Sequence, residues 1–323
     1  MEKNKLDSIS RMTEEMRAVV EFEAAQSRKW AKDGFLDPFD RQAYLESRRY
    51  WNQGGPEMSE EVDETMGGPH GEIPFRLYYP GGTVGKAENH CIVYIHGGGF
   101  VVGSVDTHDG IMRRLADETG AVVAGLDYRL APEYKFPVQI AECEALADYI
   151  RQNGAKYRVD PNRISLAGDS AGAYLSLASV LHMRDTRGDR AYVRSLLLFY
   201  GAYGLGDSMS KRLYGGAWDG LTMDALNEYN KAYANPEDED NSYRNLFCSD
   251  LTYGIPPTYI LACGLDPLLD DSRLLYEILR EHGTAVKLKV FEGTIHAFLH
   301  FGRMLPQTAE AFRNCAEFYK KHG

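Results

Sequence analysis

Short apolar segments alternate with helical patterns from about residue 90 onward, and the connections between them are brief. Six segments are predicted strands, at residues 91–95, 121–126, 164–167, 193–199, 258–262 and 286–291. Five helical patterns accompany them, at residues 107–118, 137–153, 171–184, 271–282 and 307–320. Apolar strands separated by helices are typical of a parallel sheet that is covered on both faces. The sequence therefore predicts an α/β fold with a mostly parallel, twisted sheet.

Three other regions complete this plan. The first 55 residues predict two amphipathic helices, and alternation on both sides of residues 67–69 predicts an antiparallel hairpin at a sheet edge. The stretch 201–252 carries no strand pattern and is helical at 222–233; such long excursions are usually functional. We expect one domain over residues 1–323. Its helical cap would be built from about residues 1–55 and 201–252 and would lie over the carboxyl ends of the strands.

The charge balance is acidic: 36 Lys and Arg face 47 Asp and Glu, a net charge of −11. This balance disfavours phosphate backbones and anionic membranes as partners. The longest apolar runs, residues 91–95 and 196–200, are far shorter than the roughly 20 residues that span a bilayer. The N-terminal residues offer no apolar run of the kind that a secretory signal needs. We expect a cytoplasmic protein that binds neither nucleic acid nor membranes.

The cysteines are odd in number, widely separated and without metal-ligand spacing. We expect reduced thiols packed as small hydrophobic residues, and no metal or organic cofactor. The five are Cys91, Cys143, Cys248, Cys263 and Cys315.

The strongest local signal is Gly-Asp-Ser-Ala-Gly at residues 168–172, between a predicted strand and a predicted helix. A serine in this pattern sits on a sharp turn that exposes its hydroxyl, and the flanking glycines avoid collisions with neighbouring backbone. A tight turn with a purely structural role is the alternative. We predict that Ser170 is a nucleophile.

A second signal, His-Gly-Gly-Gly-Phe at residues 96–100, follows the strand at 91–95. Uncovered backbone N–H groups of glycines can donate to the oxygen of a tetrahedral acyl-transfer intermediate. A phosphate-binding loop is the rival interpretation, but neither GxGxxG spacing nor a GK[ST] ending is present. We expect His96 to orient the loop. The predicted oxyanion hole consists of Gly97, Gly98, Gly99 and Ala171, with Gly98, Gly99 and Ala171 as its main donors.

A nucleophilic serine needs a base, and the base needs an orienting carboxylate. His296 lies a few residues after the strand at 286–291, where an α/β hydrolase requires the last member of the order Ser, Asp, His. We predict that His296 is the base. His300, four residues further on, is the competing candidate.

Asp266 follows the strand at 258–262 and is the predicted orienting carboxylate. Asp270 and Asp271 more naturally cap the following helix. A metal site made of these three carboxylates is the rival interpretation. No histidine pair or cation-loop spacing accompanies them.

Bulky side chains of the 201–252 stretch could form the wall of a small acyl pocket. The alternative is that they form the core of the insertion itself. The predicted wall consists of Tyr203, Tyr214 and Trp218, with Leu205, Leu213, Leu221, Tyr229, Trp30 and Trp51 as further members.

Five motifs together resemble the hormone-sensitive-lipase family of α/β hydrolases. They are HGGGF at 96–100, DYRLAPE at 127–133, GDSAG at 168–172, DPL at 266–268 and HAF at 296–298. The resemblance implies an α/β-hydrolase fold without a cofactor. It places the nucleophile on Ser170, the acid on Asp266, the base on His296, and the oxyanion donors on the glycines after His96 together with Ala171.

Three further stretches are similar to a cytoplasmic bacterial branch of this family: GGAWDG at 215–220, DDSRLLY at 270–276 and GTIHAFLH at 293–300. This similarity implies hydrolysis of short-chain acyl esters, including short-chain triacylglycerols. It also implies a homodimer. As regulatory partners it implies a transcriptional activator of maltose genes and an α-galactosidase.

The chain is thus predicted to hydrolyse small carboxylic esters, from acetyl to about octanoyl, through an acyl-enzyme on Ser170. A deacetylase or amidase acting on small acylated compounds remains an alternative, as does a regulatory binding protein built on the hydrolase fold. An interfacial lipase is disfavoured because the mean hydropathy is −0.41 and no long apolar lid helix is evident.

Overall fold

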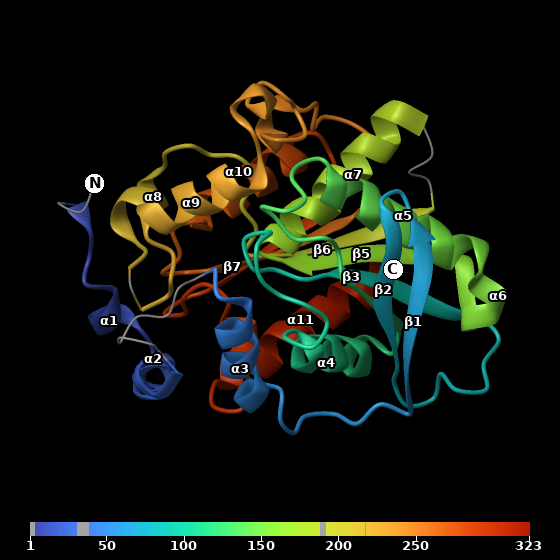
Figure 1. Cartoon of the computed structure of the whole chain (residues 1–323), viewed down its shortest axis with the longest axis horizontal. Helices are drawn as coiled ribbons and strands as arrows, with labels where there is room; N and C mark the ends of the chain where they lie inside the picture. The colour runs from blue at the N-terminus through green and yellow to red at the C-terminus, as the bar shows by residue number, and fades with distance from the viewer. Residues whose placement is uncertain (1–3, 31–38, 188–191, 217) are drawn as a thin grey trace.

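A single sheet organises the computed structural model, which describes residues 4–30, 39–187, 192–216 and 218–323 (Figure 1). Its strands follow the order β1-β2-β4-β3-β5-β6-β7-β8. All neighbours from β4 to β8 are parallel, whereas β2 runs antiparallel to both β1 and β4. This arrangement confirms the predicted α/β class. The strands are β1 (Glu60–Gly68), β2 (Gly71–Tyr79), β3 (Asn89–Ile95), β4 (Val122–Leu126), β5 (Val159–Asp169), β6 (Val193–Phe199), β7 (Thr258–Cys263) and β8 (Val286–Phe291).

The helices that were predicted between strands are all present, and their ends differ from the predicted ones by only a few residues. They are α4 (Asp109–Thr119), α5 (Val138–Gln152), α7 (Ala171–Arg187), α10 (Leu269–Glu281) and α11 (Pro306–His322). Shorter helical segments join them: α6 (Gly154–Tyr157), η3 (Pro236–Asp238), η4 (Leu246–Cys248) and η5 (Phe298–Phe301). Within the described residues, no helix is both long and apolar enough to cross a membrane.

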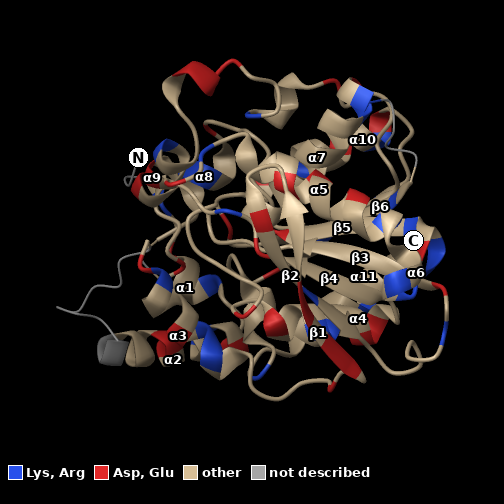
Figure 2. Ribbon diagram, turned by 45° about the vertical axis from the view of Figure 1, so that its right-hand side comes forward, with Lys and Arg blue, Asp and Glu red and all other residues tan. Residues whose placement is uncertain are grey.

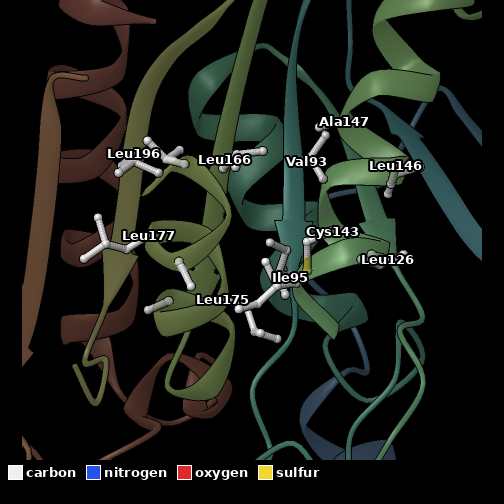
Figure 3. Packing of buried hydrophobic residues seen from close by; sticks show 14 of the residues in the cluster. Val93, Ile95, Leu126, Cys143, Leu146, Ala147, Leu166, Leu175, Leu177 and Leu196 are labelled. Carbon is white, nitrogen blue, oxygen red and sulfur yellow. The ribbon is translucent and has the colours of Figure 1, made fainter. Parts of the chain in front are cut away.

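The sheet is buried on both faces because successive side chains of a strand point to opposite sides. On β3, Cys91, Val93 and Ile95 join one apolar cluster, whereas Ile92 and Tyr94 join another. The first cluster lies under α5, α7 and α10, and Figure 3 shows its side chains between the sheet and the helices. The second lies under α4 and α11 on the opposite face (Figure 1).

The predicted hairpin forms the edge of the sheet: β1 pairs with β2 from Glu60 opposite Tyr79 to Gly68 opposite Gly71. The edge strand β1 carries four acidic residues within residues 60–64, visible as its red segment in Figure 2. Charged side chains on an edge strand oppose pairing with another chain.

The N-terminal residues form α1 (Ser8–Arg11), α2 (Glu14–Trp30) and α3 (Arg41–Trp51), so a short turn of helix precedes the two expected helices. Met16 and Val19 of α2 are fully buried in the second cluster. The N–H of Thr13 donates to the carbonyl of Gly293, 3.1 Å away. The N-terminal segment is therefore packed into the core of the domain.

The insertion between β6 and β7 contains α8 (Met209–Leu213) and α9 (Met223–Tyr233), of which only α9 was predicted. In α9, Tyr233 stacks on Phe100, with ring centroids 3.6 Å apart. From α3, Arg41 donates to the carbonyl of Val101 at 2.8 Å. Both segments of the predicted cap thus contact the loop that leaves the carboxyl end of β3.

One cysteine departs from the expected burial. Cys91, Cys143, Cys263 and Cys315 are buried, but Cys248 is exposed. It lies in the short helix η4 of the insertion, and its neighbour Leu246 supplies the buried side chain there.

Burial of α2 predicts the effect of shortening one of its side chains. Met16→Ala should reduce the free energy of unfolding by about 2 to 5 kcal/mol, because it removes a fully buried side chain and leaves a cavity. Urea unfolding followed by circular dichroism measures this loss. Met209→Ala is the matched control, since Met209 is 57% exposed. Equal stabilities of the two variants would show that α2 is not part of the core.

Candidate active site

Ser170 occupies a sharp turn between β5, which ends at Asp169, and α7, which begins at Ala171. Its φ of 53° lies in the left-handed region, where a non-glycine residue is strained by roughly 1 to 3 kcal/mol. The turn can close because glycines, Gly168 and Gly172, stand two residues before and two residues after Ser170. A Cβ on Gly172 would lie 1.9 Å from the carbonyl oxygen of Ile95, and one on Gly168 would lie 2.6 Å from the same atom.

Ser170, His296 and Asp266 form a hydrogen-bonded chain at the carboxyl ends of β5, β7 and β8. His296 Nε2 lies 2.9 Å from Ser170 Oγ, and His296 Nδ1 lies 2.7 Å from Asp266 Oδ2. The second carboxylate oxygen of Asp266 accepts from the N–H of Leu268 at 2.8 Å. Asp266 is fully buried and His296 nearly so, whereas Ser170 is half-buried. The three side chains that the sequence selected therefore lie together, with the hydroxyl at the accessible end.

Burial and charge act in opposite directions on His296. Burial disfavours the imidazolium, but the adjoining Asp266 carboxylate, assisted by Asp219 and Asp169, outweighs it and raises the pKa of His296 above its ordinary value of 6.5. Because the carboxylate contacts Nδ1, the proton of the neutral ring resides there. Nε2 is then free to accept a proton from Ser170.

The backbone N–H groups of Gly98, Gly99 and Ala171 have no hydrogen-bond acceptor within the described residues. Gly98 and Gly99 are half-buried, so these groups remain reachable. Ala171 is the first residue of α7, a helix end where unpaired N–H groups and the helix dipole favour negative charge. Unpaired N–H groups of this kind can donate to an anionic oxygen, as the predicted oxyanion hole requires.

Gly97 is a correction to the predicted oxyanion hole. Its N–H donates to Asp169 Oδ1 at 3.0 Å inside the protein and is not available to a substrate. The sequence could not show this, because the acceptor belongs to a residue 72 positions away.

His96 contacts the glycine loop at residues 97–99 from inside the protein. Its ring stacks on Tyr128, with centroids 4.2 Å apart, and its Nδ1 lies 2.7 Å from the carbonyl oxygen of Gly97. Because a carbonyl only accepts, Nδ1 carries the proton. Burial lowers the pKa of His96 to about 3, so the ring is neutral.

The sequence analysis did not predict a buried polar cluster that includes Asp169, the residue before Ser170. One ligand atom each of His108, Asp169 and His300 lies within 4.8 Å of the others, a grouping that could hold a metal ion. Asp169 Oδ1, however, already accepts from Tyr94 and Gly97. Both ring nitrogens of His300 are buried without a partner in the described structure, and burial holds its pKa well below the ordinary value. His300, the competing candidate for the base, therefore lies in this cluster, and the ring that contacts Ser170 is His296.

Asp270 and Asp271 do not cap α10, contrary to the prediction. The helix begins at Leu269, so both lie in its first turn, and they hold the insertion instead. Asp271 Oδ1 accepts from the N–H groups of Tyr203, Gly204 and Leu205, and Asp270 Oδ2 accepts from that of Ser210.

The predicted pocket wall is only partly reachable. Tyr203 is completely buried in the first apolar cluster and cannot line an accessible pocket, because its ring packs within the insertion near Phe247. Trp51 is likewise a core residue, and the side chain of Trp30 lies outside the described residues. Tyr214 and Trp218 are half-buried against the second cluster.

Tyr229 of α9 has the clearest contact with the site. A Cβ on Gly99 would lie 2.4 Å from its ring, so the tyrosine lies directly on the predicted oxyanion loop. Only the fold brings these residues together, since 130 positions separate them in the sequence.

Comparison with known proteins identifies the family. The model of a family described as having the α/β hydrolase fold matches residues 92–300. An acetyl esterase of Salmonella paratyphi A is 43% identical over 317 residues, covering 98% of this chain and 96% of that protein.

Solved structures agree with this match. A hyperthermophilic esterase from Pyrobaculum calidifontis superposes with a TM-score of 0.88 at 31% identity, over 96% of this chain and 98% of the other. The carboxylesterase EstE1, cloned from a metagenomic library, superposes with a TM-score of 0.83 at 28% identity, over 89% of this chain and 98% of the other. The chain belongs to the α/β-hydrolase-fold family, as the motifs around Ser170 and His296 predicted.

Proposed function

We propose that this protein is a serine carboxylesterase that hydrolyses short-chain acyl esters. The observation that carries the proposal is the hydrogen-bonded chain from Ser170 Oγ through His296 to Asp266. Unpaired N–H groups in the glycine loop and at the start of α7 support it. A nucleophile, a base with an orienting carboxylate, and donors for an oxyanion are what acyl transfer requires. The similarity to proteins named acetyl esterase supports the ester over the amide as substrate.

The geometry supports the following sequence. Ser170 Oγ attacks the ester carbonyl carbon while its proton passes to His296 Nε2, and the carbonyl oxygen becomes an oxyanion between the N–H groups of Gly98, Gly99 and Ala171. The imidazolium, stabilised by Asp266, then gives its proton to the leaving alcohol. Water, deprotonated by His296, attacks the acyl-enzyme and releases the carboxylic acid with regeneration of Ser170.

The remaining expectations rest on the sequence and on resemblance. A cytoplasmic location, a homodimer and the two regulatory partners, a transcriptional activator of maltose genes and an α-galactosidase, stay predictions. A metal or organic cofactor has no part in the proposed steps.

The nucleophile is tested by removing its hydroxyl. Ser170→Ala should lower kcat for p-nitrophenyl acetate by on the order of 10⁴ to 10⁶, because covalent catalysis is lost. The melting temperature shows whether the variant is folded. An organophosphonate should label Ser170 in the wild type, as located by peptide mass spectrometry. Retained turnover in a folded variant would contradict the assignment.

The pH profile tests the base. Because His296 must be neutral to accept a proton and its pKa is raised, kcat/KM should fall on acidification through an ionisation above 6.5. Asp266→Asn removes the carboxylate that raises this pKa, so the acid limb of the residual activity should move to lower pH. Asp270→Asn is the control, since that side chain bonds to Ser210 and should leave the limb in place. An unmoved limb in Asp266→Asn would contradict the pairing.

The acyl-chain preference tests the wall. We expect kcat/KM to peak at acetyl to butyryl esters and to fall by octanoyl. Tyr229→Ala opens space beside Gly99. Each methylene that this space buries contributes roughly 0.8 kcal/mol, so the ratio of kcat/KM for octanoyl to acetyl esters should rise by about tenfold or more. Tyr253→Ala is the matched control, because Tyr253 is 54% exposed. A wild-type optimum at ten carbons or longer would show an open pocket.

A further inference from the structure

Arg48 of α3 is a half-buried cation that forms no ion pair within the described part of the chain. Its Nε and Nη1 atoms are enclosed by the protein, and neither has a hydrogen-bond partner there. Arginine stays protonated in proteins, and a charge taken out of water is normally paired or hydrogen-bonded. The side chain as a whole is only half-buried, so part of it remains reachable. The guanidinium can therefore donate hydrogen bonds to a ligand.

The side chains around this guanidinium do not neutralise its charge. Its Cζ lies 4.7 Å from the ring centroid of Tyr44 and 5.9 Å from that of Phe301. A cation–π contact attracts the charge but leaves the N–H groups free. Burial, assisted by the Arg48 charge itself, holds the pKa of His300 well below its ordinary value, so that ring is neutral. Glu23 influences Arg48 electrostatically, but no ion pair joins the two, and its Oε1 accepts from the indole N–H of α3 at 2.7 Å.

The contacts of α3 place Arg48 on the side of the site where His296 lies. Arg48 influences Tyr200 electrostatically, and the ring of Tyr200 packs edge-on against that of His296, with centroids 4.9 Å apart. At the start of the same helix, Arg41 donates to the carbonyl of Val101, in the loop that follows β3. The helix therefore reaches from that loop toward His296, and Arg48 and His296 are both close to Tyr200.

We propose that Arg48 is a specificity-determining residue of the esterase, whose guanidinium binds a small anionic group, such as a carboxylate, on the acyl or the alcohol part of the ester. The inference rests on the proposed function and adds a substrate class to it. Arginine donates paired, charge-assisted hydrogen bonds to a carboxylate, and these are roughly twice as strong as neutral ones. Because the net charge of the chain is −11, a preference for an anionic ester has to come from a local cation.

Two pairs of esters, matched in shape, test the wild-type protein. Monomethyl succinate and methyl isohexanoate differ by a carboxylate against an isopropyl group on the acyl part. The anion β-acetoxypropionate and isopentyl acetate differ in the same way on the alcohol part. We expect kcat/KM for the charged ester of one pair to exceed that for the neutral ester by about tenfold or more, through a lower KM. A pH-stat measures the acid released, and the pair that shows the preference identifies the part of the ester that Arg48 binds.

Substitution of Arg48 tests the residue itself. In Arg48→Gln the ratio of kcat/KM for the charged to the neutral ester should fall by about 10- to 100-fold, because the charged hydrogen bonds are lost. The ratio cancels any general loss of activity. Arg48→Lys keeps the charge but not the planar fork and should give an intermediate ratio. Arg49→Gln is the matched control: the side chain of Arg49 is 63% exposed and lies 3.1 Å from Glu46, so the ratio should stay at the wild-type value.

The outcomes separate this inference from the esterase function. Hydrolysis of the neutral esters without a preference in either pair would overturn the anion subsite and leave the function intact. A preference that survives in folded Arg48→Gln would also overturn it. If Arg48→Gln is unfolded, Arg48→Lys takes its place, and an unchanged ratio there would count against the subsite. A wild-type protein that hydrolyses no ester would overturn the function, while calorimetric titration of wild type and Arg48→Lys with monomethyl succinate would still report whether Arg48 binds an anion.

Discussion

The close approach of α7 to the end of β3 is the contact on which the site depends. Gly172, in the first turn of α7, lies so near the carbonyl of Ile95 that any side chain would collide with it. This approach sets the N-terminus of α7 beside the end of β3, where the glycine loop begins. The left-handed backbone of Ser170 is the strained link that results, and the packed strands β3 and β5 hold it. Rigid elements thus supply the geometry of a site whose functional groups lie on loops.

Strands and helices could be predicted from the sequence where apolar periodicity was strong. The hairpin and the helices that follow each strand lie where the pattern placed them. The beginning of β5 was missed because Asp160, Asn162 and Arg163 interrupt its apolar run, although the backbone continues as a strand from Val159. Polar residues at the start of a strand do not reveal the strand in the sequence, because the backbone hydrogen bonds of a sheet do not depend on side-chain polarity.

Candidate site residues could be predicted where a motif sits on a strand end, as with Ser170, His296 and Asp266. Errors arose where a group is used by a distant partner. The N–H of Gly97 is taken by Asp169 whereas that of Gly98 is not, and Asp271 was expected at a helix cap but binds three N–H groups of the insertion. Tyr203 and Tyr229 are both bulky residues of the insertion, yet one is core and the other lies on the loop. Such choices depend on tertiary contacts that neither composition nor spacing contains.

The central claim is that this geometry performs acyl transfer through Ser170. Rapid mixing of the protein with a short-chain p-nitrophenyl ester, followed by acid quenching and peptide mass spectrometry, tests it most directly. The account predicts an early release of p-nitrophenol, no greater than the enzyme concentration, with the acyl group found on the peptide that carries Ser170. An acyl group found on another residue would contradict the claim. So would turnover in which the Ser170 peptide carries no acyl group after quenching, even under conditions that slow deacylation.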